Sequence, residues 1–339
     1  MCRHLAYLGV PASLRSLLID PPHSLCRQAW APRLQRHGTV NADGFGIGWY
    51  AGGDPVPARY RQGTPIWGDP SLPDLARVIS SGAVLAAVRS ATPGMSSGAQ
   101  AAAPFGSGRW LFSHNGAAEG WREWAEHALV LVRTIVSADH PHRAVPGGEP
   151  SVLASLEALV DSAFLWALVH DRLRAGCPMG GALAQAIAAV EAAGGTGRFN
   201  FLLTDGHSIA ATACGDTLWY RQAGGEGAVP PAEAPCTEPK AATAGAARPS
   251  ADTVAPPAGT RGGLAPAGTR APAACVVVAS EPSDDEPGWI EVPDRHLLTA
   301  TARAVSLRPL TARTRAPDST VPDSTVPHST VPAETTAAG

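Results

Sequence analysis

Residues 1–9 read Met-Cys-Arg-His-Leu-Ala-Tyr-Leu-Gly, and the other motifs of the chain are interpreted in relation to Cys2 within this stretch. Residues 4–10 are mostly apolar and are followed by Pro11, which predicts a short strand that ends there and carries Cys2 at its start. Removal of the initiator Met is usual when a small residue follows it. It would leave Cys2 with both a thiol and a free α-amine at the beginning of the first strand.

The α-amine of Cys2 could act as the base for the thiol of the same residue. A terminal amine titrates near neutral pH, so it can accept the thiol proton directly or through one water. One residue would then supply both the base and the sulfur of an activated nucleophile, without a separate histidine. A cysteine at position 2 is also compatible with an ordinary small apolar residue of a strand, and the choice depends on residues further along the chain.

Composition restricts the class of protein. The 339 residues are 45% hydrophobic and 16% charged, with a formal net charge of −3. A charge so close to zero gives no electrostatic support for nucleic acid or an anionic membrane surface as a partner. The six cysteines are scattered without a Cys-x-x-Cys pair, which favours reduced thiols in a cytoplasmic protein over a disulfide framework or a zinc site. No apolar leader is recognised, because Arg3, His4 and Arg15 interrupt the first residues.

Residues 44–49, Gly-Phe-Gly-Ile-Gly-Trp, alternate glycine with large apolar side chains. This period of two predicts a strand, and the missing side chains on one face let another backbone or a ligand approach closely. A nucleotide-binding loop is not favoured, because no helix follows and residues 54–57, Asp-Pro-Val-Pro, break the segment. Residues 59–66 predict the return strand of a hairpin.

Two polar motifs follow short apolar segments. Residues 83–88 predict a strand that ends in Arg89-Ser-Ala-Thr92, and residues 110–113 predict a strand that runs into His114-Asn115-Gly116. Binding and catalytic groups are often placed where rigid strands end. We therefore expect the two motifs to contribute to one site.

The remaining elements alternate helices and strands. The apolar stretch 152–173 contains three acidic residues, so it predicts a buried helix and not a membrane span. The other expected elements are helices at 13–19, 72–80 (capped by Gly82), 121–133, 161–176 and 181–193, a hairpin at 199–214 with an Asp205-Gly206 turn, and strands at 217–221 and 275–282.

Two segments lack the residues needed for a core. Residues 222–273 are rich in Ala, Pro, Gly and Thr, and the tail repeats Asp-Ser-Thr-Val-Pro. Both are predicted to be disordered. The favoured interpretation is a solvated spacer, and the alternative is a segment that binds a partner. The predicted organisation is therefore one domain formed by 2–221 plus 274–310, a disordered insertion at 222–273 and a disordered tail at 311–339.

The polar motifs and Cys2 together meet the needs of an acyl-transfer site, which requires a nucleophile, a base, oxyanion donors and groups that hold the substrate. Cys2 could supply the first two. The Asn115 side-chain amide and the Gly116 backbone N–H could converge on one oxygen, and glycine suits that place because a Cβ would obstruct the approach.

The other candidates match the two charged groups of an amino acid. Arg89 offers a planar guanidinium that fits a carboxylate, Thr92 offers a hydroxyl beside it, and Asp161 could pair with an ammonium. Each also has a structural interpretation: a surface ion pair for Arg89, a turn hydroxyl for Thr92, a helix cap for Asp161 and a plain turn for residues 115–116. The two histidines beside the motifs, His4 and His114, are expected to be packed or hydrogen-bonded and not catalytic.

The order of these motifs resembles the class II glutamine amidotransferase domain, an N-terminal-nucleophile hydrolase. The motifs on which this resemblance rests are a terminal Cys, Arg-x-x-Thr, His-Asn-Gly and a later Asp before a helix. Met-Cys-Arg-His-Leu, Asn-Ala-Asp-Gly-Phe-Gly-Ile-Gly-Trp, Arg-Ser-Ala-Thr-Pro-Gly-Met, Ser-His-Asn-Gly and Ala-Ser-Glu-Pro further resemble a stand-alone branch, the γ-glutamyl hydrolases of ergothioneine biosynthesis. The likeness covers roughly residues 2–221 and 274–300. Arg3 stands where many class II amidotransferases have Gly, which fits the stand-alone branch.

The resemblance implies an α+β fold, a four-layer αββα sandwich of two antiparallel sheets between helical layers. It implies hydrolysis of a γ-glutamyl amide through a thioester, with glutamate removed from γ-glutamyl-hercynylcysteine S-oxide and no cofactor or metal. The expected partner is this small molecule, with a homodimer as a further possibility. The site residues it implies are Cys2 as nucleophile, Asn115 and Gly116 as oxyanion hole, and Arg89, Thr92 and Asp161 as glutamyl-binding residues.

Two other functions stay open at this point. The chain could be a glutaminase subunit that delivers ammonia to a separate synthase, although no synthase domain fits after residue 221. It could also be a non-catalytic γ-glutamyl-binding module, but a binding protein needs neither a thiol nor a free amine at residue 2.

Overall fold

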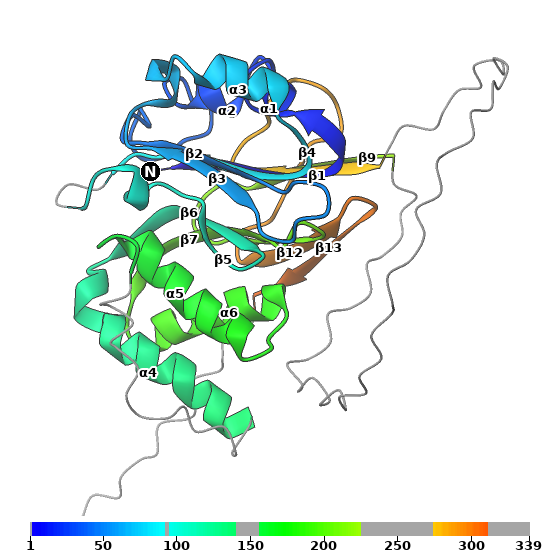
Figure 1. Ribbon diagram of the computed structural model, residues 1–339. Coiled ribbons are helices and arrows are strands. Elements are labelled where there is room, and N and C mark those ends of the chain that lie inside the picture. The colour runs from blue at the N-terminus through cyan, green and yellow to red at the C-terminus, as the bar shows by residue number, and fades with distance from the viewer. Residues whose placement is uncertain (1, 92–94, 140–155, 225–273, 311–339) are drawn as a thin grey trace, which may run out of the picture.

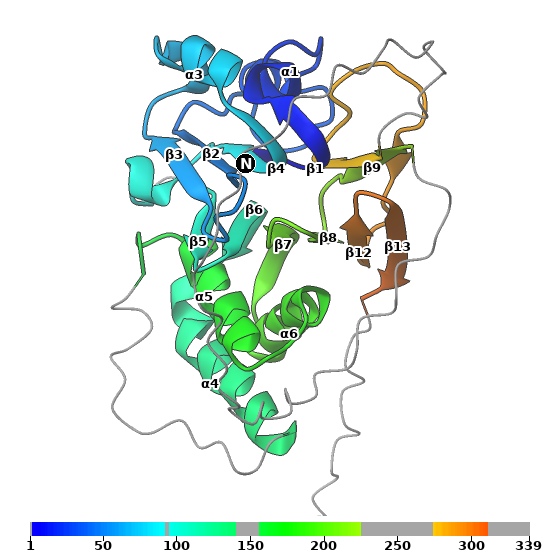
Figure 2. The same cartoon turned by 45° about the vertical axis from the view of Figure 1, so that its right-hand side comes forward.

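A computed structural model describes residues 2–91, 95–139, 156–224 and 274–310. In these residues two antiparallel sheets lie face to face, and helices cover the outer face of each (Figure 1). The expected αββα sandwich is confirmed. The view turned by 45° separates the helical layers, with α1 and α3 beyond one sheet and α4, α5 and α6 beyond the other (Figure 2).

The first sheet has seven strands among the described residues, in the order β11-β9-β10-β1-β4-β2-β3. Its helical cover is α1 (Leu14–Leu18), α2 (Leu25–Gln28) and α3 (Leu72–Val78). The strands are β1 (Arg3–Ser13), β2 (Phe45–Trp49), β3 (Ala58–Gln62), β4 (Ser80–Val88), β9 (Trp219–Ala223), β10 (Cys275–Ala279) and β11 (Ile290–Glu291).

The second sheet has six strands in the described part of the chain, in the order β13-β12-β8-β7-β6-β5. Its helical cover is α4 (Trp121–Asp139), α5 (Asp161–Arg174) and α6 (Met179–Ala192). The strands are β5 (Phe105–Ser107), β6 (Trp110–Glu119), β7 (Thr196–Thr204), β8 (Ile209–Ala213), β12 (His296–Thr301) and β13 (Ala304–Pro309). Two 3₁₀ turns, Ile66–Gly68 and Ala99–Ala101, complete the elements.

The core has three layers, because each strand sends alternate side chains to opposite faces. On β1, Leu5 and Tyr7 pack against the helices α1–α3, whereas Ala6 and Leu8 pack between the two sheets. A third cluster lies between the second sheet and helices α4–α6. This alternation decides which side chains of β1 face the other sheet.

The glycines of β2 permit a close approach, as their spacing predicts. An added Cβ at Gly46 would lie 2.2 Å from the carbonyl oxygen of Ala103, and one at Gly48 would lie 2.5 Å from a methyl carbon of Leu111. Protein groups, and not a ligand, therefore fill the space that these two glycines leave.

Several sequence-based boundaries are wrong. The return strand expected at 59–66 is β3, which ends at Gln62, and in the described residues the helix expected over 152–173 begins only at Asp161. The first strand does not stop at Pro11 but continues to Ser13; the β1–β4 register shifts between Leu8 and Ala12, and such an irregularity accommodates a proline. Gly82 lies inside β4 and does not cap a helix. The 110–113 strand extends to Glu119, because pairing with β7 overrides the weak strand preference of Asn and Gly.

The predicted insertion begins inside an element, since β9 runs through Ala223. Cys275 pairs with Ala223, so the two ends of the intervening segment lie side by side. The predicted disorder of 225–273 and 311–339 falls outside the described residues.

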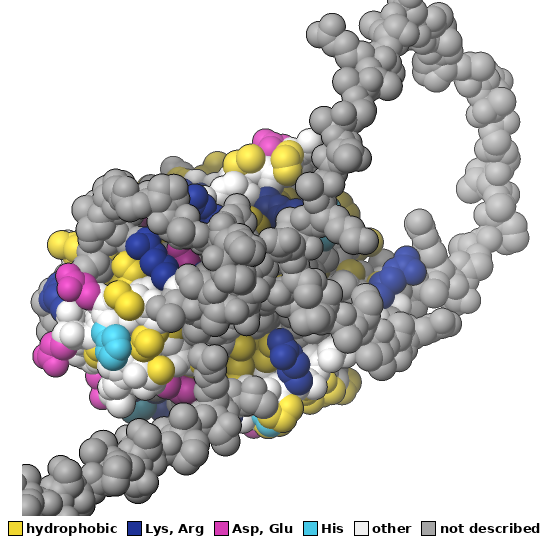
Figure 3. All heavy atoms as spheres, turned by 90° about the horizontal axis from the view of Figure 1, so that it is seen from below, with side chains coloured by type: hydrophobic (Ala, Val, Ile, Leu, Met, Phe, Trp, Pro, Cys, Tyr) yellow, Lys and Arg dark blue, Asp and Glu magenta, His cyan; other side chains and the backbone are white. Residues whose placement is uncertain are grey.

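On the face seen from below, basic, acidic and hydrophobic side chains are interspersed where they are visible, without a large patch of one charge (Figure 3). None of the helices in the described ranges combines the length and apolarity needed to cross a bilayer.

Candidate active site

Cys2 lies at the beginning of β1, in the middle of the first sheet, and is half-buried. The antiparallel register pairs Arg3 with Val88, so the next pair along places Cys2 opposite Arg89 at the end of β4. The Nε of Arg3 donates a hydrogen bond to the carbonyl oxygen of Cys2 at 3.0 Å, which fixes the backbone of the cysteine.

Alternation places Cys2 and Asn115 on facing surfaces of the two sheets. Cys2 shares its face of β1 with His4, whose Nδ1 lies 3.1 Å from the Oγ of Ser113 on β6. Ser113 and Asn115 are two residues apart and therefore share the face of β6 that meets the first sheet. The thiol-bearing residue and the predicted oxyanion residue thus face the same inter-sheet space.

Asn115 lies within β6 and is fully buried. Its Nδ2 donates to the Oγ of Ser280 at 3.2 Å, and no described residue bonds its Oδ1. The plain-turn interpretation of residues 115–116 is wrong, since Asn115 pairs with Asn200 of β7. The amide nitrogen carries two hydrogens, so one N–H remains for a ligand.

The backbone N–H of Gly116 points to an edge of β6 that lacks a partner strand in the described residues. On that side β5 pairs with β6 only as far as Phe112. The N–H of Ala118 points to the same edge, where it donates to the Asp161 carboxylate at 3.0 Å. Because N–H directions alternate along a strand, the N–H of Gly116 also points there and can donate to an oxygen.

The need for glycine at 116 has a different origin from the one expected. An added Cβ would lie 1.9 Å from the carbonyl oxygen of Arg198 and 2.6 Å from the Nε2 of His114. The close approach is therefore that of β7, and not that of a substrate.

Arg89 is buried, with only 7% of its surface exposed. Its Nη1 and Nη2 donate to two backbone carbonyl oxygens, those of Asp43 at 3.3 Å and Ser96 at 2.8 Å. A guanidinium has five N–H donors, and no carboxylate of the described residues forms an ion pair with Arg89. The surface ion-pair interpretation is therefore wrong, and the positive charge stays available for a ligand carboxylate.

Asp161 is the first residue of α5 and is also buried. Its Oδ2 accepts the N–H of Ala118 and its Oδ1 accepts the N–H of Ser162 at 2.8 Å. The carboxylate thus joins the end of β6 to the helix start, where a negative charge is favourable. Each oxygen keeps a lone pair that could accept from an ammonium. Thr92, the remaining predicted binding residue, lies outside the described residues.

The two histidines are hydrogen-bonded within the protein, as expected. The Nε2 of His114 donates to the carbonyl oxygen of Arg198 at 2.8 Å, and its Nδ1 lies 3.0 Å from the Oγ of Ser162. Burial lowers the pKa of His114 and lowers that of His4 further. Burial therefore favours the neutral form of both rings.

Two residues of the site were not predicted as such, Ser280 and Glu281, which directly follow β10. The Oγ of Ser280 accepts from the backbone N–H of His4 at 3.0 Å as well as from Asn115. The fully buried Glu281 accepts the N–H groups of Arg33 and Leu34 and lies 3.9 Å from the Nη1 of Arg3. The sequence signal for both residues was the Ala-Ser-Glu-Pro motif at 279–282, which carried part of the family resemblance but gave neither residue a role.

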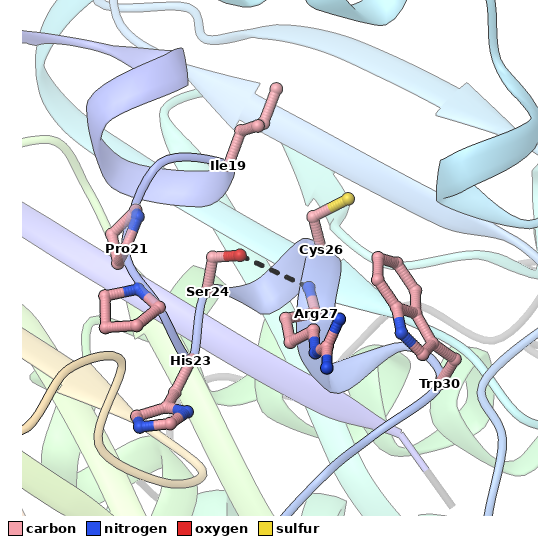
Figure 4. A pocket seen from close by; sticks show the side chains of 8 residues that line it. Ile19, Pro21, His23, Ser24, Cys26, Arg27 and Trp30 are labelled. Carbon is pink, nitrogen blue, oxygen red and sulfur yellow. Dashed lines mark hydrogen bonds between the residues drawn. The ribbon is translucent and has the colours of Figure 1, made fainter.

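A pocket lies apart from these residues, around the loop between α1 and α2. Figure 4 shows His23, Cys26, Arg27 and Trp30 around it, with the Oγ of Ser24 accepting from the Arg27 N–H. None of the predicted site residues lines this pocket. Among the described residues no group of three or more His, Cys, Asp or Glu side chains is placed to hold a metal ion.

Comparisons with known proteins agree with this fold and its motifs. The chain is 34% identical over 310 residues to the γ-glutamyl-hercynylcysteine sulfoxide hydrolase of Mycolicibacterium smegmatis, covering 91% of this chain and all of that protein. A structure of the allosteric regulatory enzyme of purine biosynthesis matches 92% of this chain and 50% of its own, at 12% identity and a TM-score of 0.50. A glutamine aminotransferase class-II domain protein from Silicibacter pomeroyi matches at 22% identity and a TM-score of 0.48, over 91% of this chain and all of its own. A scan against protein-family models gives no match.

Two facing antiparallel sheets, with a cysteine at the start of a central strand, define an amidohydrolase of the N-terminal-nucleophile type, in the class II glutamine amidotransferase group. The extent of the sequence match narrows this class to one family. The chain belongs to the γ-glutamyl-hercynylcysteine sulfoxide hydrolases.

Proposed function

We propose that this chain hydrolyses the γ-glutamyl amide bond of γ-glutamyl-hercynylcysteine S-oxide and releases glutamate. The observation that carries the proposal is the placement of Cys2 and Asn115 on facing surfaces of the two sheets, with Arg89 directly after the β4 residue that pairs with Arg3. The substrate is the one that the name of the mycobacterial relative states.

Acylation begins with the transfer of the Cys2 thiol proton to the α-amine of the same residue, once Met1 has been removed. The thiolate attacks the γ-carbonyl carbon, and the oxyanion accepts hydrogen bonds from the Asn115 amide and the Gly116 N–H. The C–N bond then breaks, and the leaving amine takes its proton from the Cys2 ammonium. The product of this half-reaction is a γ-glutamyl thioester on Cys2.

Deacylation uses the same groups with water in place of the thiol. The neutral α-amine of Cys2 accepts a proton from water, whose oxygen attacks the thioester carbonyl. Collapse of the second tetrahedral intermediate breaks the C–S bond and returns the proton to the thiolate. Glutamate leaves, and the starting state is restored.

The glutamyl group is held by the two charged groups on its α-carbon. The N–H groups of Arg89 that are not bonded to backbone carbonyls bind the α-carboxylate, and a hydrogen bond to the same carboxylate is the role predicted for Thr92. The Asp161 carboxylate binds the α-ammonium through its remaining lone pairs. Because Arg89 and Asp161 are both buried, their charges act on the substrate in a less polar medium than water.

The deciding experiment offers purified protein γ-glutamyl-hercynylcysteine S-oxide and L-glutamine in parallel and measures glutamate release. We expect a higher kcat/KM with the S-oxide, and loss of both activities in Cys2→Ala with unchanged thermal unfolding. A preference for glutamine would favour a glutaminase that supplies a separate synthase. Full activity of Cys2→Ala, or a mass showing that active protein retains Met1, would refute the mechanism.

We also propose that the enzyme works in the cytoplasm. The five cysteines of the described residues are free thiols, as is usual in a reducing compartment.

A further inference from the structure

Ser280 holds a central place between the two sheets. It follows β10 directly and is fully buried. Its backbone N–H donates to the carbonyl oxygen of His4 at 3.0 Å, and its Oγ accepts from the N–H of the same residue at 3.0 Å. Two hydrogen bonds thus join Ser280 to the backbone of His4, which lies two residues after Cys2 on the same chain segment.

From this fixed position the hydroxyl reaches across to the second sheet. The Nδ2 of Asn115 donates to the Ser280 Oγ at 3.2 Å, and this is the one hydrogen bond of the Asn115 side chain within the described residues. The final torsion of an asparagine side chain is broad, with no sharp preference of its own. The orientation of this amide therefore depends on Ser280.

We propose that Ser280 is a positioning residue, which aims the free N–H of the Asn115 amide at the oxyanion. The proposal depends on the oxyanion role of Asn115 in the proposed function. One hydrogen of the amide nitrogen is engaged by Ser280, which leaves the second in a fixed direction. Since Ser280 is bonded to β1 and to Asn115, it links the strand of the nucleophile directly to the oxyanion donor.

The geometry gives a matched control at Thr217. The Oγ1 of Thr217 donates to the carbonyl oxygen of Ser280 at 2.8 Å, so it supports the backbone of the serine. No hydrogen bond joins Thr217 to the Asn115 side chain in the described structure. Thr217→Val therefore loosens the same segment without removing the hydroxyl that holds the amide.

The test is a double-mutant cycle on the full chain, with glutamate release from γ-glutamyl-hercynylcysteine S-oxide as the assay. We expect Asn115→Ala to lower kcat by about 10²–10³. Ser280→Ala should lower kcat by about tenfold, the effect of one positioning hydrogen bond, with KM changed by less than about twofold. In the Asn115→Ala background, Ser280→Ala should cost less than about a further twofold, because its effect passes through the amide.

Several results would overturn the proposal. A Ser280→Ala kcat within about twofold of wild type, or losses that multiply in the double mutant, would show that Ser280 does not act through Asn115. The same conclusion follows if Thr217→Val slows the enzyme as much as Ser280→Ala does. If Ser280→Ala does not fold, Ser280→Cys, which keeps the shape but is a weak acceptor, takes its place in the cycle. Wild-type activity of Asn115→Ala would instead refute the oxyanion role itself, and with it the proposed function of that residue.

Discussion

Gly116→Ala is the substitution for which the structure gives the sharpest expectation. Cβ contacts shorter than 3.0 Å essentially never occur, and the new Cβ would lie 1.9 Å from the Arg198 carbonyl oxygen, so β6 and β7 must part by about 1.1 Å. The movement also disturbs the 2.8 Å hydrogen bond from the His114 Nε2 to that oxygen. Overpacking of this kind costs about 1–3 kcal/mol of unfolding free energy.

The same movement displaces the proposed oxyanion donors. A misplacement of about 1 Å can cost about 10²-fold in rate, so we expect kcat to fall by about that factor. Urea denaturation and steady-state kinetics measure the two effects, with Gly52→Ala as control, since nothing lies within 4 Å of a Cβ there. If Gly116→Ala kept kcat within about threefold and the unfolding free energy within about 0.5 kcal/mol, the close approach of β7 would not be what requires glycine.

Three further substitutions or conditions test other parts of the site. Arg89→Lys replaces a planar fork by a point charge and should raise KM by about tenfold or more, measured in the glutamate-release assay. Glu281→Gln should lower the unfolding free energy by about 3–5 kcal/mol in denaturant titrations, because it removes the ion-pair partner of the buried Arg3 guanidinium, whereas the exposed Asp74→Asn should change it by less than about 0.5 kcal/mol. Burial lowers the His114 pKa from its usual 6.5, so the unfolded state binds more protons than the folded state. The contribution of His114 to the unfolding free energy should be fully present above about pH 6.5 and decrease at lower pH by up to about 1.4 kcal/mol per pH unit. In His114→Gln, denaturant titrations should show a smaller slope of the unfolding free energy against pH.

Much of the layered fold could be predicted, because periodicity and family resemblance agreed. The alternation in residues 44–49 correctly predicted a strand with a closely approached face. The hairpin formed by β7 and β8 is also confirmed, but its turn is longer than Asp205-Gly206: Thr204 pairs with Ile209, so residues 205–208 make the connection. Such signals are local, so a single sequence contains them.

The parts that could not be predicted depend on contacts between distant segments. His114-Asn115-Gly116 looked like a strand end, and only the pairing of Asn115 with Asn200 makes it a strand interior. Ser280 gives no local sign of its bond to Asn115, because 165 residues separate them. The catalytic and binding roles of the predicted residues stay predictions, and Thr92 lies outside the described residues.

The pairing of β1 with β10 has a consequence for biosynthesis. Leu5 lies opposite Ala279, so β1 is joined on one side by a strand that is synthesised long after it. Until then the edge of β1 that β10 will cover has no native partner, and closing such a long loop slows folding. The sheet around Cys2 therefore cannot be completed before β10 has been synthesised, and the activity should appear only after that point of translation.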